Sequence, residues 1–155
     1  MTKQPKLTVE LVPASMWGAN LRAILAPSVW KKVRLNVYAA AGNKCEICSG
    51  TGKNGKVECH ERWEFDDLHS VQKLVGLICL CPTCHHVKHV GRLIAEKKDL
   101  KTMEAVLWQL VRVNNWSQKQ VDAHIAAAFV QFHERSKREW TLDVTWLGDH
   151  EEVMN

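Results

Sequence analysis

Two short cysteine pairs constrain this chain more than any other feature of its sequence. Cys45 and Cys48 lie in "KCEICSG", and Cys81 and Cys84 repeat the same two-residue gap in "LCPTCHHVKH". A tight turn with this spacing directs two thiolates at one ion, and two such turns complete the tetrahedral ligand set of a structural zinc site. The alternative is four buried thiols without a ligand, but chance seldom produces two equal pairs. We therefore predict one structural Zn²⁺ held by these four cysteines.

The segment between the cysteine pairs predicts a β-hairpin. The stretches "VECHERWEF" at 57–65 and "VQKLVGLICLC" at 71–81 read as strands, and the polar stretch "DDLHS" separates them. After Cys84 the pattern becomes helical. The expected order is cysteine pair, strand, turn, strand, cysteine pair and helix. A ββα unit of this kind has few core residues of its own, so it draws much of its folding free energy from the metal.

The composition is that of one globular domain without a membrane partner. Apolar residues make up 46% of the 155 residues and charged residues 25%, which argues against disorder. The longest apolar run is too short to span a membrane, and the polar start lacks the apolar core of a signal peptide. We expect a cytoplasmic protein whose cysteines stay reduced, with Cys59 and Cys79 as small core residues. The net charge of +4 permits a polyanionic partner without requiring one.

The sequence on either side of this unit predicts helices and two lone strands. Apolar residues recur at helical spacing in residues 17–25, 30–41, 103–110 and 121–132, the last after a capping box of Ser117 and Gln120. The stretches "KLTVELV" at 6–12 and "WTLDVTWL" at 140–147 alternate as strands do. Each needs a partner for its backbone groups. We therefore predict that these two segments pair antiparallel and bring the ends of the chain together.

The expected fold is α+β and forms a single domain over residues 1–155. Its centre is the zinc-stapled hairpin-helix unit at 44–92. An N-terminal strand and helices at 1–43 precede it, and C-terminal helices with the closing strand at 98–155 follow it. The small antiparallel pair of terminal strands completes the architecture.

A second group of metal-capable side chains lies beside the cysteines. His85 and His89 are four residues apart on the expected helix, so they share a face and could bind one ion or one phosphate. His60 lies on the first strand of the hairpin, on the face of Glu58 and Arg62, whereas Glu61 points to the other face. Alternatively, these histidines are surface groups or hydrogen-bond partners of the zinc thiolates. For His86 alone that second interpretation is preferred.

These residues resemble the HNH nuclease family, in which two C-x2-C pairs often hold a ββα-metal fold. The matching stretches are "CEIC" at 45–48, "ECH" at 58–60 and "LCPTCH" at 80–85, followed by "VKH". The resemblance implies that His60 is the general base and that His85 ligates a catalytic divalent ion such as Mg²⁺, Mn²⁺ or Ni²⁺. It leaves His89 and Glu61 as further members of the catalytic set. Glu58 or Glu61 would supply an oxygen ligand, and His89 a further nitrogen.

The chain departs from the family pattern at two positions. Cys59 stands immediately before the expected base, where the family usually has an acidic or histidine ligand. Gly76 stands five residues before Cys81, where the family usually has an asparagine. Of the usual hydrolytic set, the two histidines at 60 and 85 are plainly present.

Two functions are compatible with this sequence. The first is a metal-dependent HNH-type endonuclease that hydrolyses DNA phosphodiester bonds. The second is a catalytically inactive HNH-like zinc module that binds DNA or a protein partner as a regulator or inhibitor. In either case the basic residues that follow the metal site could meet phosphates, or they could form a solvated face; these are Lys88, Arg92, Lys97 and Lys98. The strandedness of the substrate and the oligomeric state are left open.

Overall fold

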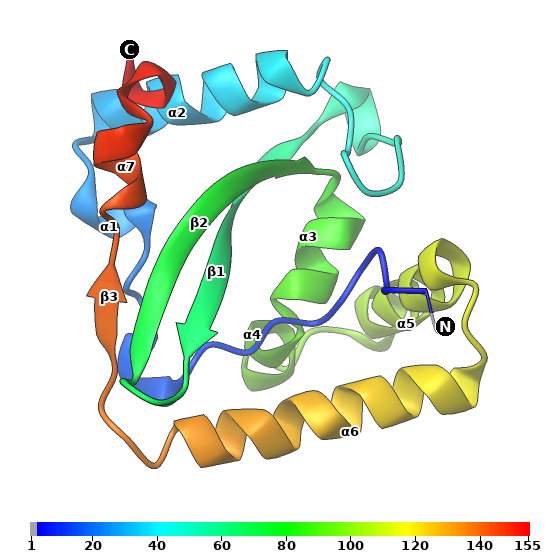
Figure 1. Cartoon of the computed structure of the whole chain (residues 1–155). Coiled ribbons are helices and arrows are strands. Elements are labelled where there is room, and N and C mark those ends of the chain that lie inside the picture. Colours follow the sequence, from blue (N-terminus) through cyan, green and yellow to red (C-terminus); the bar gives the residue numbers. More distant parts are fainter. Residues whose placement is uncertain (1–2) are drawn as a thin grey trace.

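The computed structural model describes residues 3–155 and has an α+β architecture. Its described part contains a three-stranded mixed sheet and seven α-helices (Figure 1). The strands are β1 (Glu58–Asp66), β2 (Val71–Leu80) and β3 (Thr141–Asp143), in the order β1-β2-β3. β1 and β2 run antiparallel, while β3 pairs with β2 in parallel.

Short and long helices surround this sheet. The helices are α1 (Leu21–Ile24), α2 (Pro27–Ala40), α3 (Pro82–Lys88), α4 (Val90–Ala95), α5 (Leu100–Asn114), α6 (Gln118–Arg135) and α7 (Trp146–Asp149), with 3-10 turns η1 (Ala14–Met16), η2 (Lys53–Gly55) and η3 (Glu151–Met154). The predicted capping box is confirmed, because Ser117 and Gln120 bond each other's backbone at the start of α6. None of the helices described in residues 3–155 has the length and apolarity needed to cross a membrane.

The predicted hairpin is confirmed, together with the helix that follows it. Glu58 pairs with Leu80 at one end of the two strands and Asp66 with Val71 at the other. The register shifts between Arg62 and Trp63, a local irregularity that increases strand twist. α3 begins directly after Cys81, so the second cysteine pair spans the junction of strand and helix.

The predicted antiparallel pairing of the two terminal segments is wrong. Residues 6–12 form no strand, and β3 finds its partner in β2. The backbone of the first segment is satisfied by other groups. Asn114 Oδ1 accepts from the amides of Lys6 and Leu7, His124 Nε2 accepts from Val9 N, and the Lys88 carbonyl accepts from Glu10 N. The alternation in the sequence therefore records the burial of alternate side chains, with Leu7 and Val9 inside, and not a sheet ladder.

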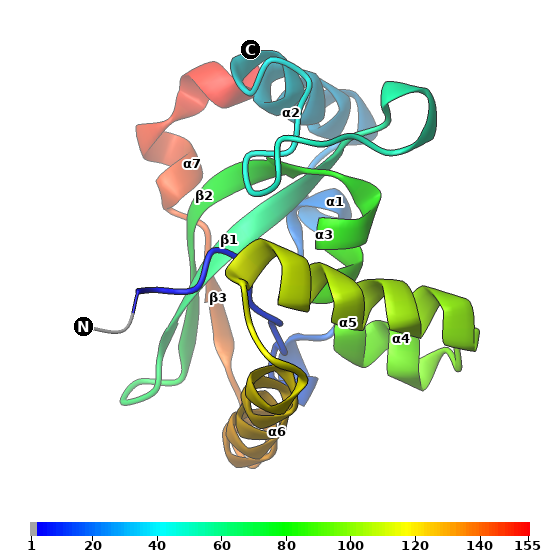
Figure 2. The same ribbon diagram turned by 90° about the vertical axis from the view of Figure 1, so that its right-hand side faces the viewer.

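Apolar clusters lie on opposite sides of the hairpin, the two described next and a third that contains Val37, Cys59 and Cys79. One joins Leu7 and Val9 to the cysteine region and to residues of α3, α4, α5 and α6. The other joins Leu21, Leu74 and Leu147, so it links the α1 and α7 side to β2. Figures 1 and 2 show this arrangement, with α1, α2 and α7 on one side of the sheet and α3 to α6 on the other.

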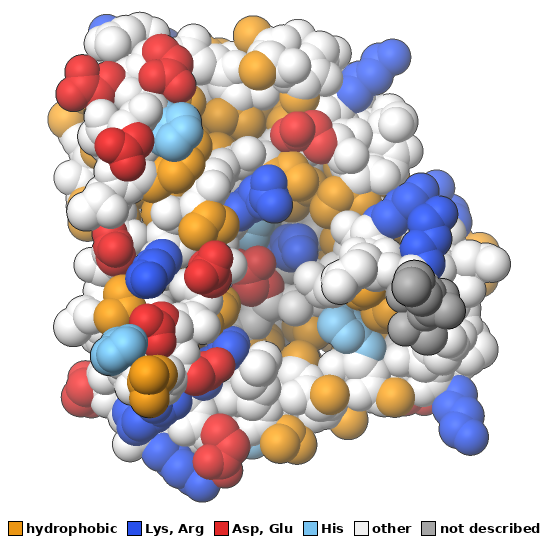
Figure 3. All heavy atoms as spheres, in the orientation of Figure 1, with side chains coloured by type: hydrophobic (Ala, Val, Ile, Leu, Met, Phe, Trp, Pro, Cys, Tyr) orange, Lys and Arg blue, Asp and Glu red, His pale blue; other side chains and the backbone are white. Residues whose placement is uncertain are grey.

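The N-terminal segment crosses a hollowed face of the molecule between these two groups of helices. The space-filling view shows the middle of this face hollowed, with basic and acidic side chains inside the hollow (Figure 3). A cavity of about 240 Å³ lies between residues 9–11, β1 and α6, and Glu10 is among the residues that line it. The segment thus carries a charged side chain into the interior of this face.

We predict that Leu7→Ala lowers the free energy of unfolding by about 2–5 kcal/mol, because this leucine is fully buried between the N-terminal segment and the helices. The measurement is urea unfolding followed by far-UV circular dichroism. The matched control is Leu100→Ala, since the leucine at position 100 is 81% exposed and its truncation should change stability by less than about 0.5 kcal/mol. Equal losses in both variants would show that residues 6–12 do not belong to the core.

Candidate metal centres

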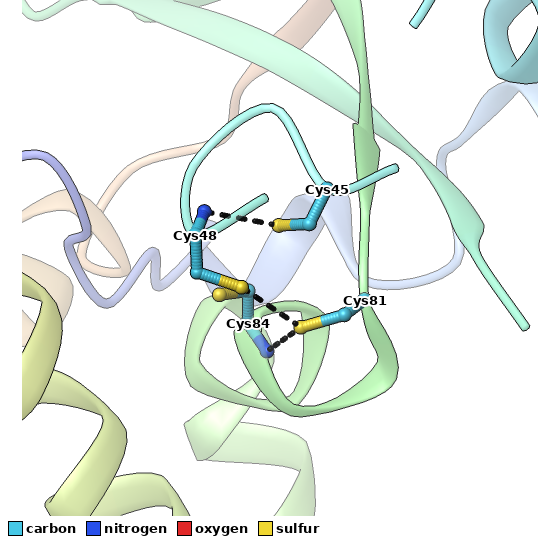
Figure 4. A group of neighbouring side chains, drawn as sticks. All are labelled: Cys45, Cys48, Cys81 and Cys84. Carbon is cyan, nitrogen blue, oxygen red and sulfur yellow. Dashed lines mark hydrogen bonds between the residues drawn. The ribbon is translucent and has the colours of Figure 1, made fainter. Parts of the chain in front are cut away.

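The four cysteines of the two pairs converge on one point. Their sulfur atoms all lie within 4.8 Å of one another, and Cys48 Sγ is 3.6 Å from Cys81 Sγ. Figure 4 shows Cys45 and Cys48 on the loop before β1, facing Cys81 and Cys84 at the start of α3. All four are free thiols. This group could hold a metal ion such as zinc.

Hydrogen bonds to sulfur prepare these cysteines for a cation. Backbone amides approach two of the sulfurs, Cys48 N at 3.5 Å from Cys45 Sγ and Cys84 N at 3.4 Å from Cys81 Sγ. The buried Gln109 amide donates to Cys84 Sγ at 3.1 Å. A hydrogen bond with Cys84 lowers the pKa of Cys45 to about 4, while the same contact raises the pKa of Cys84. The group therefore favours at least one thiolate, which is the form that binds a metal.

The two remaining cysteines are core residues, as predicted. Cys59 and Cys79 face each other in the register of β1 and β2 and are buried. Burial raises the pKa of Cys59 to about 12 and that of Cys79 to about 11, so both are neutral thiols at pH 7. Neither belongs to the four-cysteine group.

A second candidate centre is formed by three histidines. Ring nitrogens of His60, His85 and His89 lie within 4.8 Å of one another. His85 Nε2 and His89 Nε2 are only 3.0 Å apart, because the two residues follow each other by one turn of α3. His60 reaches them from β1, with ring centroids 5.2 Å from His85 and 5.0 Å from His89.

Glu58 fixes the orientation of His85. Its Oε2 lies 2.7 Å from His85 Nδ1, and its Oε1 lies 3.1 Å from Lys56 Nζ. The contact with His85 is the main reason that the pKa of Glu58 falls to about 2. A carboxylate that accepts from Nδ1–H leaves Nε2 with its lone pair, which is how histidine ligands of metals are commonly oriented. His85 Nε2 therefore faces His89 as a potential ligand atom.

His60 is buried without a hydrogen-bond partner. Its side chain is 3% exposed, and neither ring nitrogen has a partner among the described residues. A buried polar group without a partner costs free energy, so its presence calls for an explanation such as a catalytic role or a bound ion. Desolvation by the surrounding residues and the nearby His60, His85 and Arg92 lower the pKa of His89 to about 3, so it is neutral at pH 7 although its side chain is partly open to solvent. His89 lies at the solvent side of the group.

The structure brings together three of the four residues of the predicted catalytic set. Glu61 is not among them, because it projects from the opposite face of β1 and its Oε1 accepts from Leu21 N at 3.0 Å. His86 is exposed and lies outside the group. Glu10 was not identified from the sequence, yet its Oε1 lies 3.6 Å from His60 Nε2. The one sequence feature that could have indicated Glu10 is its place in residues 6–12, an acidic residue within an alternating apolar segment.

Basic residues lie close to the histidines. Lys88 follows His85 on α3, and its Nζ donates to Thr8 Oγ1 at 3.0 Å. Burial lowers the pKa of Lys88, the Glu10 carboxylate opposes this shift, and Arg62 adds to it. The other predicted basic residues are exposed, and two of them, Arg92 and Lys98, pair with Glu96. Arg92 nevertheless helps to lower the pKa of His89, so it joins Lys88 and Arg62 as a basic residue near the histidine group.

Comparisons with protein-family models, curated proteins and solved structures give no significant match for this chain. The geometry of the two candidate centres is therefore the basis for assigning a function.

We predict that the purified protein contains one zinc ion per chain and that Cys81→Ser loses it. The variant should also unfold the hairpin and α3, because the metal supplies much of the folding free energy of a small site with four ligands. Zinc content by mass spectrometry and tryptophan fluorescence are the measurements. Cys59→Ala is the control, since Cys59 lies outside the four-cysteine group and should keep the zinc. A zinc-free wild type would contradict the assignment.

Proposed function

We propose that this chain is a metal-dependent nuclease that hydrolyses DNA phosphodiester bonds in the manner of the HNH family. The observation that supports this most is the buried His60, whose unpartnered ring faces His85 and His89. The sequence of hairpin, cysteine pair and helix resembles the ββα-metal unit of that family. We assign a structural Zn²⁺ to the four cysteines and a catalytic divalent ion to the histidine group.

His85 and His89 would hold the catalytic ion through their neighbouring Nε2 atoms, with Glu58 orienting His85. A bound divalent ion, such as Mg²⁺, Mn²⁺ or Ni²⁺, polarises the phosphate and stabilises the charge on the leaving oxygen. His60 takes a proton at a ring nitrogen from the attacking water. The oxygen of that water forms a new bond to phosphorus, and the bond from phosphorus to the leaving sugar oxygen breaks. The ring nitrogens of His60 have no other hydrogen-bond partner within the described residues, so one of them can take part in this transfer.

Lys88 and Arg62 support a nucleic-acid substrate. Lys88 follows His85 on α3, and Arg62 lies close enough to Lys88 to lower its pKa. Arg62 is exposed and takes part in no ion pair within residues 3–155. Their positive charges would bind phosphates on either side of the scissile bond and help fix the register of the strand. Such contacts displace counterions, so the affinity for DNA should fall steeply with salt concentration.

A second candidate function is a zinc module that binds DNA or a protein partner without cleaving. It is favoured by Gly76, which offers no side-chain amide where the HNH pattern has one. A Cβ added to Gly76 would meet only the side chain of Arg62, at 3.7 Å, so the strand has room for a side chain that the chain lacks. Cys59, buried on the other face of β1, likewise supplies no ligand to the histidine group.

We predict that His60→Ala reduces plasmid nicking by about 10²- to 10⁴-fold while leaving the binding of the divalent ion nearly unchanged, because it removes the base and not a ligand. His85→Ala should abolish both nicking and ion binding. The measurements are nicking assays with Mg²⁺, Mn²⁺, Ni²⁺ or Zn²⁺ and calorimetric titration with Mn²⁺. His86→Ala is the matched control, since that histidine is exposed beside His85 and lies outside the group.

The two variants separate the roles of the histidines. If His60→Ala loses ion binding as well, His60 is a third ligand and the base is another group. If the wild type shows no metal-dependent cleavage above the variants on double- or single-stranded DNA, the nuclease proposal fails. Retained salt-sensitive DNA binding would then support the non-cleaving module.

A further inference from the structure

Glu10 carries a buried carboxylate oxygen toward the histidine group. Its side chain is 18% exposed, its Oε1 lies 3.6 Å from His60 Nε2, and this oxygen has no hydrogen-bond partner within the described residues. An ionised carboxylate is costly to bury unless a cation or hydrogen bonds compensate it. The partly buried Lys88 supplies some compensation, but the oxygen that faces His60 is left without a direct partner.

Two acidic residues close to His60 in the sequence of β1, Glu58 and Glu61, are already engaged. Glu58 accepts from His85 Nδ1 and pairs with Lys56, so it acts on the ion through His85. Glu61 caps the amide of Leu21 on the opposite face of the hairpin. The sequence had offered these two as sources of an oxygen ligand. Their contacts leave Glu10 as the carboxylate that remains free to face the histidines.

Several side chains far apart in sequence hold Glu10 in this place. Asn114 at the end of α5 binds the amides of Lys6 and Leu7 and donates to the Leu7 carbonyl. His124 of α6 binds Val9 N. Lys88 binds Glu10 N through its carbonyl and Thr8 through its ammonium group. A segment without strand partners is thus fixed from Lys6 up to the amide of Glu10.

We propose that Glu10 supplies the carboxylate of the divalent-ion site, and that residues 6–10 serve to hold it there. This inference rests on the proposed histidine-bound ion. Nitrogen ligands alone favour ions such as Zn²⁺, Ni²⁺ and Cu²⁺, whereas Mg²⁺ and Mn²⁺ prefer carboxylate oxygen and water. Glu10 lies outside the tight group formed by the three histidines, so its oxygen would act at the edge of the site, toward water on the ion.

The test is calorimetric titration of the zinc-loaded protein with Mn²⁺, comparing wild type with Glu10→Gln. The substitution keeps the size of the side chain and removes its charge. We expect Glu10→Gln to weaken Mn²⁺ binding by about 10- to 100-fold, as losses of groups around a metal commonly do. Zinc content and the thermal unfolding temperature without Mn²⁺ should stay at the wild-type value, which shows that the variant is folded. Glu104→Gln is the control, because Glu104 is exposed on α5 and should leave Mn²⁺ binding unchanged.

The outcomes separate this inference from the proposed function. Equal Mn²⁺ affinity in wild type and Glu10→Gln overturns the role of Glu10 and leaves the histidine site intact. A wild type that binds no Mn²⁺, Mg²⁺ or Ni²⁺ overturns the divalent-ion site itself, and the role of Glu10 with it. Weakened Mn²⁺ binding in Glu104→Gln as well would mean that overall charge causes the effect, which also overturns the role of Glu10.

Discussion

The meeting of the two cysteine pairs is the constraint on which the rest of this structure depends. Cys45 and Cys48 lie before the hairpin, and Cys81 and Cys84 lie after it, so their convergence closes β1 onto β2. Glu46 reinforces this closure, because its amide and its carboxylate bind the carbonyl and the amide of Cys79. Since α3 starts at the second pair, the same closure directs the helix across the face of β1. One group of sulfur atoms thus sets the positions of the histidines.

Local patterns in the sequence were sufficient to predict the secondary-structure elements around the four cysteines. The hairpin, the helix after Cys84 and the capping box at Ser117 all follow from residues a few positions apart. The grouping of the histidines was also accessible, because one turn of helix separates His85 from His89 and the strand period places Glu58 on the face of His60. Each of these predictions depends on residues close together in the sequence, and tertiary contacts do not override it.

The predictions that were wrong, and the feature that was missed, depend on contacts between residues far apart in the sequence. Residues 6–12 alternate in the same way as a strand, but alternation records which side chains are buried and not which groups satisfy the backbone. Asn114 and His124 satisfy it here, and no pattern near residue 7 indicates residues more than a hundred positions away. For the same reason the partner of β3 was misassigned, and the position of Glu10 was not foreseen.

The contacts of Asn114 and His124 with residues 6–10 determine when the histidine group can be completed during synthesis. Glu10 is synthesised before Asn114 and His124, which fix its segment from more than a hundred residues further along the chain. A nascent chain that already contains both cysteine pairs and all three histidines still lacks α5 and α6. The histidine group therefore gains its acidic neighbour only after α5 and α6 have been made, so a nascent chain that stops before them carries an incomplete site.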